Sequence, residues 1–200
     1  RQQPHPPIIM SASNDDSART AARHRAIMGL ALIPDLKVAK HLIDTYMDAA
    51  HEAGWQPTPE HVLVGLNTCI AETSAAARDE LAKGSAYFGK VLLGGPRTAQ
   101  KLVLQKSRYF ADDEVRKEFV GRIKNAKERS LQDSIDAGVT LCGTPDEVVG
   151  QIQRVREELG CGWINMNMKI GNVPNDGVLR SMELFRDHVR PAFPVPEDAA

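Results

Sequence analysis

The sequence lacks most of the features that mark special classes of protein. Its three cysteines, Cys69, Cys142 and Cys161, are widely spaced and never form a CxxC pair, so neither a disulfide framework nor a zinc ribbon is indicated. No stretch approaches the ~20 apolar residues that a membrane-spanning helix needs. The N-terminus has no apolar signal-peptide core. We therefore expect a reduced, cytoplasmic setting and no membrane partner.

An excess of charge of one sign is also absent. Lys and Arg number 25 and Asp and Glu 26, which gives a formal net charge of −1 and no support for nucleic-acid binding. The six histidines form no HExxH motif and no i, i+4 pair, so no metal site is predicted. What is present is an ordinary globular composition, with 200 residues that are 42% hydrophobic. That is enough for one domain with a sizeable core.

Apolar runs alternate with capped helices along the chain. Four runs predict strands near residues 8–13, 26–32, 62–70 and 163–168. The last helix carries an apolar stripe at helical spacing, formed by Val178, Met182, Phe185 and Val189. Residues from about 97 to 138 are polar and weakly periodic. We interpret them as a helical excursion within a single unit that spans residues 1–200.

Strands that alternate with helices of crossover length predict an α/β fold with a parallel sheet. Four strands leave two architectures open. One is a small, open, doubly wound sheet. The other is the C-terminal half of a TIM-type (β/α)8 barrel, which takes ~250 residues when whole. The chain begins with Arg1 rather than methionine, and this favours a piece of a longer barrel.

A possible phosphate loop lies between Gly84 and Lys90, which fit the spacing GxxxxGK. The next residue is Val91, where Ser or Thr must bind magnesium, and the segment lies inside a helical run rather than after a strand. Small residues in a helix are the better interpretation.

The junction between the first strand and its helix is a stronger candidate for an anion site. It contains Ser11, Ser13, Asn14 and Ser17, and ligands of parallel α/β folds gather beyond the C-terminal ends of the strands. A helix N-terminus offers backbone N–H groups and a positive dipole end to a phosphate. Plain helix capping by Ser13 or Asn14 is the alternative. The two aspartates that follow would also repel a bound phosphate.

A second candidate site lies at the end of the last strand, in the stretch from Asn165 to Met168, with Met166 and Asn167 as the predicted substrate residues. Methionine and asparagine side chains can line a pocket for a flat or apolar substrate. They can equally serve packing and a turn.

Three blocks of the sequence resemble the bacterial luciferase-like, flavin-dependent monooxygenases. They are PPIIMSASN at 6–14 followed by AAR at 21–23, GTPDEV at 143–148, and VLRSMELF running on to VRPAF at 178–193. Their order and spacing also fit that family. The resemblance implies a (β/α)8 barrel of which this chain is the C-terminal half, with strands five to eight.

The resemblance further implies a monooxygenase that uses reduced FMN and O2 on a small organic substrate. A separate flavin reductase would supply the FMNH2, and the enzyme would be a homo-oligomer. Matched residue by residue, the flavin phosphate site of the family falls on Ser11, Ser13, Asn14 and Ser17. Asn14 departs from luciferase itself, which has a hydroxyl residue there. Catalytic groups belong to the N-terminal half, so none is assigned to this chain.

Other functions stay open at this point. The related F420-dependent reductases share the barrel, so F420 is a possible cofactor in place of FMN. A luciferase-like relative could also bind flavin without turnover. From another class, a non-catalytic, flavodoxin-like binding domain could be complete at 200 residues. Such a domain needs a phosphate loop after its first strand, and no such loop lies upstream of Ile8.

Overall fold

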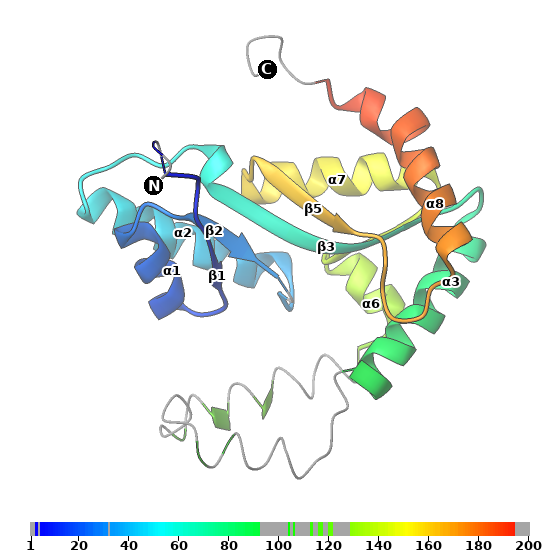
Figure 1. Cartoon of the computed structure of the whole chain (residues 1–200), viewed down its shortest axis with the longest axis horizontal. Coiled ribbons are helices and arrows are strands. Elements are labelled where there is room, and N and C mark those ends of the chain that lie inside the picture. Colours follow the sequence, from blue (N-terminus) through cyan, green and yellow to red (C-terminus); the bar gives the residue numbers. More distant parts are fainter. Residues whose placement is uncertain are drawn as a thin grey trace.

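The computed structural model of the chain contains a parallel sheet flanked by helices (Figure 1). It describes residues 3, 5–31, 33–92 and 129–194, together with 104, 106, 113, 116, 117, 120 and 121. Most of the excursion expected at 97–138 therefore lies outside the described residues. Among the helices that are described, none is both long enough and apolar enough to cross a membrane.

In the described part of the chain, five strands form the sheet. They are β1 (Ile9–Ala12), β2 (Ile27–Leu30), β3 (Val62–Ile70), β4 (Thr140–Gly143) and β5 (Trp163–Asn167). Each described pairing, β1–β2, β2–β3, β3–β4 and β3–β5, is parallel. The prediction of parallel β/α units is confirmed.

The prediction of four strands is wrong, because β4 is a fifth. This strand is only four residues long and all of its residues are buried, so it lacks the polar alternation that identifies a half-buried strand. It also lies directly between Gly138 and the helix cap at Thr144, where a short apolar run resembles a connection. Tertiary pairing with the end of β3 turns this run into a strand.

Helices connect the strands and cover one face of the sheet. They are α1 (Asp15–Arg23), α2 (Leu36–Glu52), α3 (Ser74–Tyr87), α6 (Leu131–Asp136), α7 (Pro145–Leu159) and α8 (Asn175–Leu184). Single turns of 3-10 helix lie at η1 (Pro59–His61) and η5 (Arg190–Ala192), and π-helical turns extend α3 and α8 at η2 (Phe88–Leu92) and η4 (Phe185–Val189).

β3 is the central strand of the sheet, since strands pair along both of its edges. Leu63 has Cα partners in β2 and in β5, and Asn67 has partners in β4 and in β5. Therefore β2 and β4 share one edge of β3, and β5 follows the other. Among the described strands, β1, β4 and β5 each pair along one edge and have no partner along the other.

The two faces of the sheet differ in burial. Val62, Val64 and Leu66 of β3 are 0–1% exposed and lie in the main core beneath the helices. Leu63 and Gly65 alternate with them and are half-buried, so they point to the opposite face. One face thus packs on helices, and the other is partly open to solvent.

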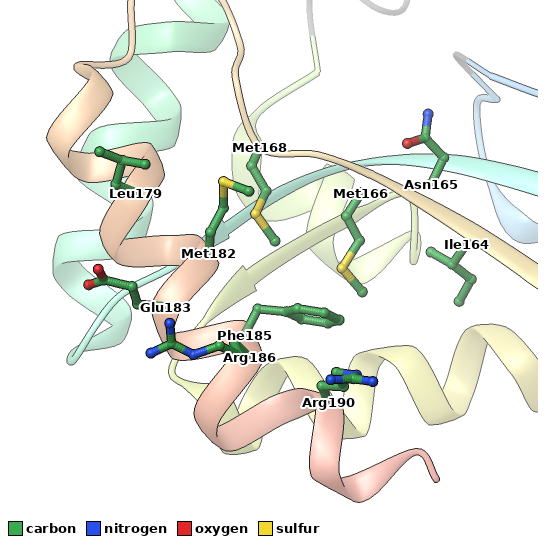
Figure 2. A pocket seen from close by; sticks show the side chains of 10 residues that line it. All are labelled: Ile164, Asn165, Met166, Met168, Leu179, Met182, Glu183, Phe185, Arg186 and Arg190. Atoms are coloured by element: carbon green, nitrogen blue, oxygen red, sulfur yellow. The ribbon is translucent and has the colours of Figure 1, made fainter. Parts of the chain in front are cut away.

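The apolar stripe predicted for the last helix is only partly buried. Val189 is fully buried, Val178 and Phe185 are half-buried, and Met182 is 52% exposed. Two features explain the difference. Met182 lies beside the unpaired edge of β5 (Figure 2), and the helix widens to a π-helix from Phe185, so a constant 3.6-residue spacing no longer holds.

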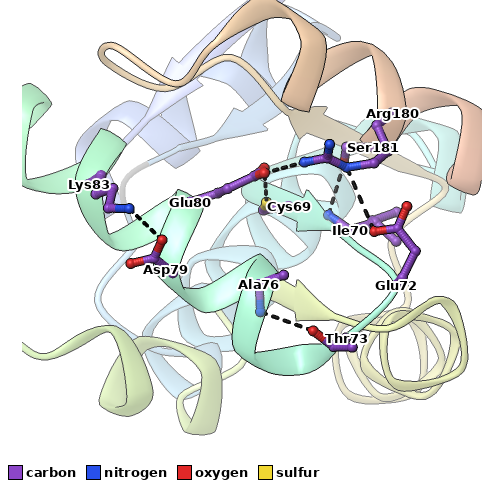
Figure 3. Close-up of polar contacts among 10 residues, drawn as sticks. All are labelled: Cys69, Ile70, Glu72, Thr73, Ala76, Asp79, Glu80, Lys83, Arg180 and Ser181. Carbon is purple, nitrogen blue, oxygen red and sulfur yellow. Dashed lines mark hydrogen bonds and ion pairs between the residues drawn. The ribbon is translucent and has the colours of Figure 1, made fainter.

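Polar contacts fasten α8 to β3 and α3 (Figure 3). The Ser181 hydroxyl, on a residue that is 2% exposed, accepts a hydrogen bond of 2.8 Å from the backbone N–H of Ile70. Arg180 donates to Glu80 of α3, and its Nε lies 3.8 Å from a carboxylate oxygen of Glu72. The last residue of the central strand is therefore held by a helix that follows it by more than a hundred positions.

Replacing Ser181 by alanine should destabilise the fold. The change leaves the buried N–H of Ile70 without an acceptor, which costs about 1–3 kcal/mol. Urea unfolding of Ser181→Ala should show a lower midpoint with an unchanged slope. Ser134→Ala is the matched control, because the Ser134 hydroxyl donates to the carbonyl of Ser130 at the start of its own helix. This substitution should change the free energy of unfolding by less than ~0.5 kcal/mol. Equal effects of the two substitutions would contradict this account.

Candidate functional site

The junction between β1 and α1 is a closed capping box. Oδ1 of Asn14 accepts a hydrogen bond of 2.9 Å from the backbone N–H of Ser17. In return, Oγ of Ser17 accepts from the N–H groups of Ser13 at 3.0 Å and of Asn14 at 3.1 Å. The capping that the sequence offered as one alternative is therefore present. Two adjacent amides also converge on a single oxygen atom, as they would on an oxygen of a bound anion.

Acidic groups adjoin this junction. Asp15 and Asp16 occupy the first turn of α1, where carboxylates complement the helix dipole. Nε2 of His41 lies 3.0 Å from Oδ1 of Asp15, and both side chains are largely exposed. The sequence has no Lys or Arg between Ile8 and Ala18. A phosphate at this junction therefore needs a cation from another part of the protein.

The start of α7, at the same end of the sheet, is capped by a side-chain carboxylate of the chain itself. Oε2 of Glu147 accepts from the Ser74 hydroxyl at 2.6 Å and from the Thr144 N–H at 2.7 Å. These hydrogen bonds hold the pKa of Glu147 below its ordinary value. Gly143 has a φ of +149°, and a Cβ there would meet the Glu147 carboxylate. Glu147 thus takes the position that an external anion would need.

Met166 and Asn167 are consecutive residues of β5, so their side chains point to opposite faces. Met166 is half-buried and packs against the main core. Asn167 is exposed, and its Nδ2 donates to Oδ1 of Asn67 in β3 at 3.3 Å. The structure therefore does not bring the two predicted substrate residues into one pocket.

Met166 lines a groove between β5 and the end of α8 (Figure 2). The groove has a volume of about 710 Å³. Met168, Met182 and Phe185 give it an apolar wall, and Arg186 and Arg190 also line it. It lies on the helix-covered face, beside the unpaired edge of β5.

Asn167 belongs instead to the other face, which we call the open face. This face consists of alternate residues of four strands, namely Ile9, Ser11, Ile27, Gly29, Leu63, Gly65, Asn67, Trp163, Asn165 and Asn167. A Cβ added to Gly29 would lie 3.1 Å from Cγ2 of Ile9, which shows that neighbouring strands share this face.

The open face changes from large apolar residues to small or polar ones along the strands. Its residues toward the N-terminal strand ends are large and apolar, whereas toward the C-terminal ends they are serine, glycine and asparagine. Ser11 and Asn167 both lie in the polar part, on β1 and β5. The fold thus brings a predicted phosphate residue and a predicted substrate residue to one face without direct contact.

One polar residue of this face, Asn67, was missed by the sequence reasoning. Asn165 belongs to the stretch that the sequence singled out at the end of the last strand, and it points to the same face as Asn167. No local signal links Asn67 to them, because that contact depends on the register between β3 and β5.

The cysteines are free and buried. Cys69 and Cys142 are register partners in β3 and β4. Burial, with the neighbouring thiol adding to it, raises the pKa of Cys69 to about 12, and burial raises the pKa of Cys142 to about 11. Both are therefore protonated at neutral pH and serve packing. A cluster of three metal-ligating side chains does not occur among the described residues.

Removing Cys69 should change how stability depends on pH. The pKa of this thiol is higher in the folded state than its ordinary value of 9.0, so the unfolded chain loses the proton first as pH rises. The free energy of unfolding should stay constant below pH ~9 and decrease as the pH rises toward ~12. Urea unfolding at a series of pH values should show a shallower fall for Cys69→Ala. An unchanged slope between pH ~9 and ~11 would contradict the buried, protonated thiol.

Comparison with known proteins identifies relatives of this arrangement. The model of the family described as luciferase-like monooxygenase matches residues 1–161 of the chain. No curated protein matches it. Among solved structures, it is similar to the monooxygenase RslO1 from Streptomyces bottropensis, with 25% identity and a TM-score of 0.69 over 96% of this chain and 50% of that one.

Two further solved structures share the fold. The oxygenating constituent of 3,6-diketocamphane monooxygenase from Pseudomonas putida, in complex with FMN, is 20% identical with a TM-score of 0.68, over 96% of this chain and 50% of that one. The F420-dependent tetrahydromethanopterin reductase from Methanopyrus kandleri is 20% identical with a TM-score of 0.58, over 94% of this chain and 51% of that one. The chain spans about half the length of these relatives.

Proposed function

Because this chain belongs to the luciferase-like monooxygenase family, we propose that it is the C-terminal half of a monooxygenase that uses reduced FMN and O2 on a small organic substrate. Family membership makes the protein an oxidoreductase, and its parallel β/α units correspond to about half of a TIM-type barrel. The observation that carries the cofactor part of the proposal is the start of α1, where the amides of Ser13 and Asn14 converge on one oxygen.

The donors at the start of α1 fit the 5′-phosphate of FMN. In the proposed complex, a phosphate oxygen takes the acceptor position that Oγ of Ser17 now holds, and the hydroxyls of Ser11 and Ser17 lie beside it. The positive end of the α1 dipole favours the anion. An arginine from the N-terminal half completes the neutralisation. The bound flavin supplies the electrons that monooxygenation requires, and the residues of this chain bind and orient it.

An F420-dependent oxidoreductase is the second candidate function, because a reductase of that class shares the fold. A non-catalytic flavin-binding domain is the third. The flavin reductase that would supply FMNH2, the homo-oligomer and the cytoplasmic location stay predictions from the sequence. The grouping of Met166 and Asn167 as substrate residues also stays a prediction from the sequence. The opposite directions of their side chains argue against it.

A negative charge at Ser13 should weaken FMN binding. Ser13→Asp adds repulsion beside Asp15 and Asp16 and should cost about 1–3 kcal/mol of FMN binding. Ser13→Asn is the matched control, because it has the same shape without the charge. Fluorescence titration should show the loss for FMN in Ser13→Asp alone. Riboflavin, which lacks the phosphate, should bind all three proteins alike. Equal losses of affinity for FMN and riboflavin would mean that Ser13 and Asn14 cap α1 and do not bind the phosphate.

The 200 residues alone should not catalyse oxygenation. β1 and β5 have unpaired edges, which invite association with another chain, and the groups that the family assigns to catalysis belong to the N-terminal half. The assay supplies reduced FMN, O2 and aldehyde or alkane substrates to the purified chain, and product is measured by mass spectrometry. Turnover by a monomeric 200-residue protein would overturn this prediction.

A further inference from the structure

A histidine from a neighbouring helix contacts one of the two aspartates at the start of α1. His41 belongs to the second turn of α2, and its Nε2 lies 3.0 Å from Oδ1 of Asp15. The two side chains are 64% and 49% exposed, so water and protons reach both of them. The pair therefore joins α2 to the first turn of α1, beside the amides of Ser13 and Asn14.

The contact with Asp15 defines which ring nitrogen of His41 carries a hydrogen. An ionised carboxylate accepts hydrogen bonds and has none to donate, so Nε2 is the donor of this bond. A further proton then binds at Nδ1 and gives the ring a positive charge. Histidine is the side chain that gains this charge between pH ~8 and pH ~5. The contact is thus a hydrogen bond at the upper end of this range and an ion pair at the lower end.

Other charged groups near the ring lie on three helices. They are Lys37, Lys40 and Asp44 on α2, Arg19 on α1 and Glu158 on α7. Lys40 is paired with Asp44, and Glu158 is paired with Arg154 of its own helix. These pairs leave Asp15 as the carboxylate that contacts His41. A proton on His41 therefore offsets the charge of Asp15 before that of any other group.

From this arrangement we propose that protonation of His41 controls how tightly the start of α1 binds the phosphate of FMN. Neutral His41 leaves the charge of Asp15 uncompensated, and this charge repels the phosphate. Protonated His41 compensates it, so affinity for FMN rises as the pH falls. His41 acts through Asp15, whereas the arginine expected from the N-terminal half contacts the phosphate. The inference rests on the proposed function for the phosphate site and adds its regulation by pH.

The size of this effect is limited by the exposure of the pair. Charges at a protein surface interact weakly through water, so compensation of one aspartate should change FMN affinity by about 3-fold. Salt screens such charges, because the Debye length falls from ~10 Å at 0.1 M to ~3 Å at 1 M. The effect should therefore be present in dilute buffer and absent in about 1 M NaCl.

The test compares FMN and riboflavin binding at pH ~8 and pH ~5.5, in the protein at its full natural length. Fluorescence titration is applied to the wild type, His41→Gln, Asp15→Asn and His51→Gln. His51→Gln is the matched control, because His51 is an exposed residue of α2 and lies about 15 Å further along that helix. FMN's own phosphate gains a proton near pH ~6, but this change is common to all four proteins. Circular dichroism verifies that each variant is folded.

The preference for FMN over riboflavin should depend on pH differently in these proteins. Between pH ~8 and pH ~5.5, the ratio of the two affinities should rise about 3-fold more in the wild type than in His41→Gln. His51→Gln should behave as wild type. Asp15→Asn should bind FMN more tightly at pH ~8 and then follow the pH profile of His41→Gln. If Asp15→Asn fails to fold, His41→Gln decides the result, because its side chain is largely exposed.

Two results would overturn the proposal. One is a pH profile for FMN that His41→Gln leaves unchanged. The other is an effect of His41→Gln that is equal for FMN and riboflavin, since it would then act on the fold and not on the phosphate.

The Ser13→Asp titration separates this inference from the proposed function. A selective loss of FMN affinity in Ser13→Asp, together with an unchanged pH profile in His41→Gln, would support the phosphate site and overturn the role of His41. Equal losses for FMN and riboflavin in Ser13→Asp would contradict the phosphate site itself, and the role of His41 would fall with it.

Discussion

Parallel pairing along β3 decides which side chains meet on each face of the sheet. Its register with β5 sets Asn67 beside Asn167 and Gly65 beside Asn165. A shift by one residue would turn Leu66 toward the open face and Asn67 into the core, because side chains alternate along a strand. The 0% exposure of Val62 and Val64 makes such a shift costly. Burial of one face thus secures the arrangement of polar groups on the other.

Helix starts at the C-terminal end of the sheet differ in how they satisfy their amides. Asp35 accepts from the N–H of Val38 at 2.8 Å, and Glu147 accepts from Thr144, so α2 and α7 carry their own anions. The start of α1 is capped by the neutral side chains of Asn14 and Ser17, although Asp15 and Asp16 lie in its first turn. Neutral acceptors can be exchanged for a phosphate oxygen without removing a charge, whereas a carboxylate would repel the phosphate. A phosphate at the start of α1 would therefore need a cation that offsets these two aspartates.

Local signals account for much of what could be predicted. Long apolar runs identified β3, and capping residues identified the start of α1, because both depend on neighbours in sequence. The family follows from short blocks around the junction of β1 and α1 and around the cap at Thr144. By contrast, β4 depends on pairing with the end of β3, and the contact between Asn67 and Asn167 depends on the register of strands about a hundred residues apart. Alternation along β5 also places Met166 and Asn167 on different faces, which their grouping as substrate residues of one site did not take into account.

The long separation between β3 and its partners has a consequence for the cell that makes this protein. Asn67 and Asn167 are 100 residues apart in sequence, and Ser181 follows its partner Ile70 by 111 residues. A ribosome adds ~5–20 residues per second, so one edge of β3 stays without its partner for roughly 5–20 s after it is synthesised. During that interval a nine-residue, largely apolar strand can pair with neighbouring nascent chains. Yield in vivo should then depend on translation speed and on chaperones that shield this edge.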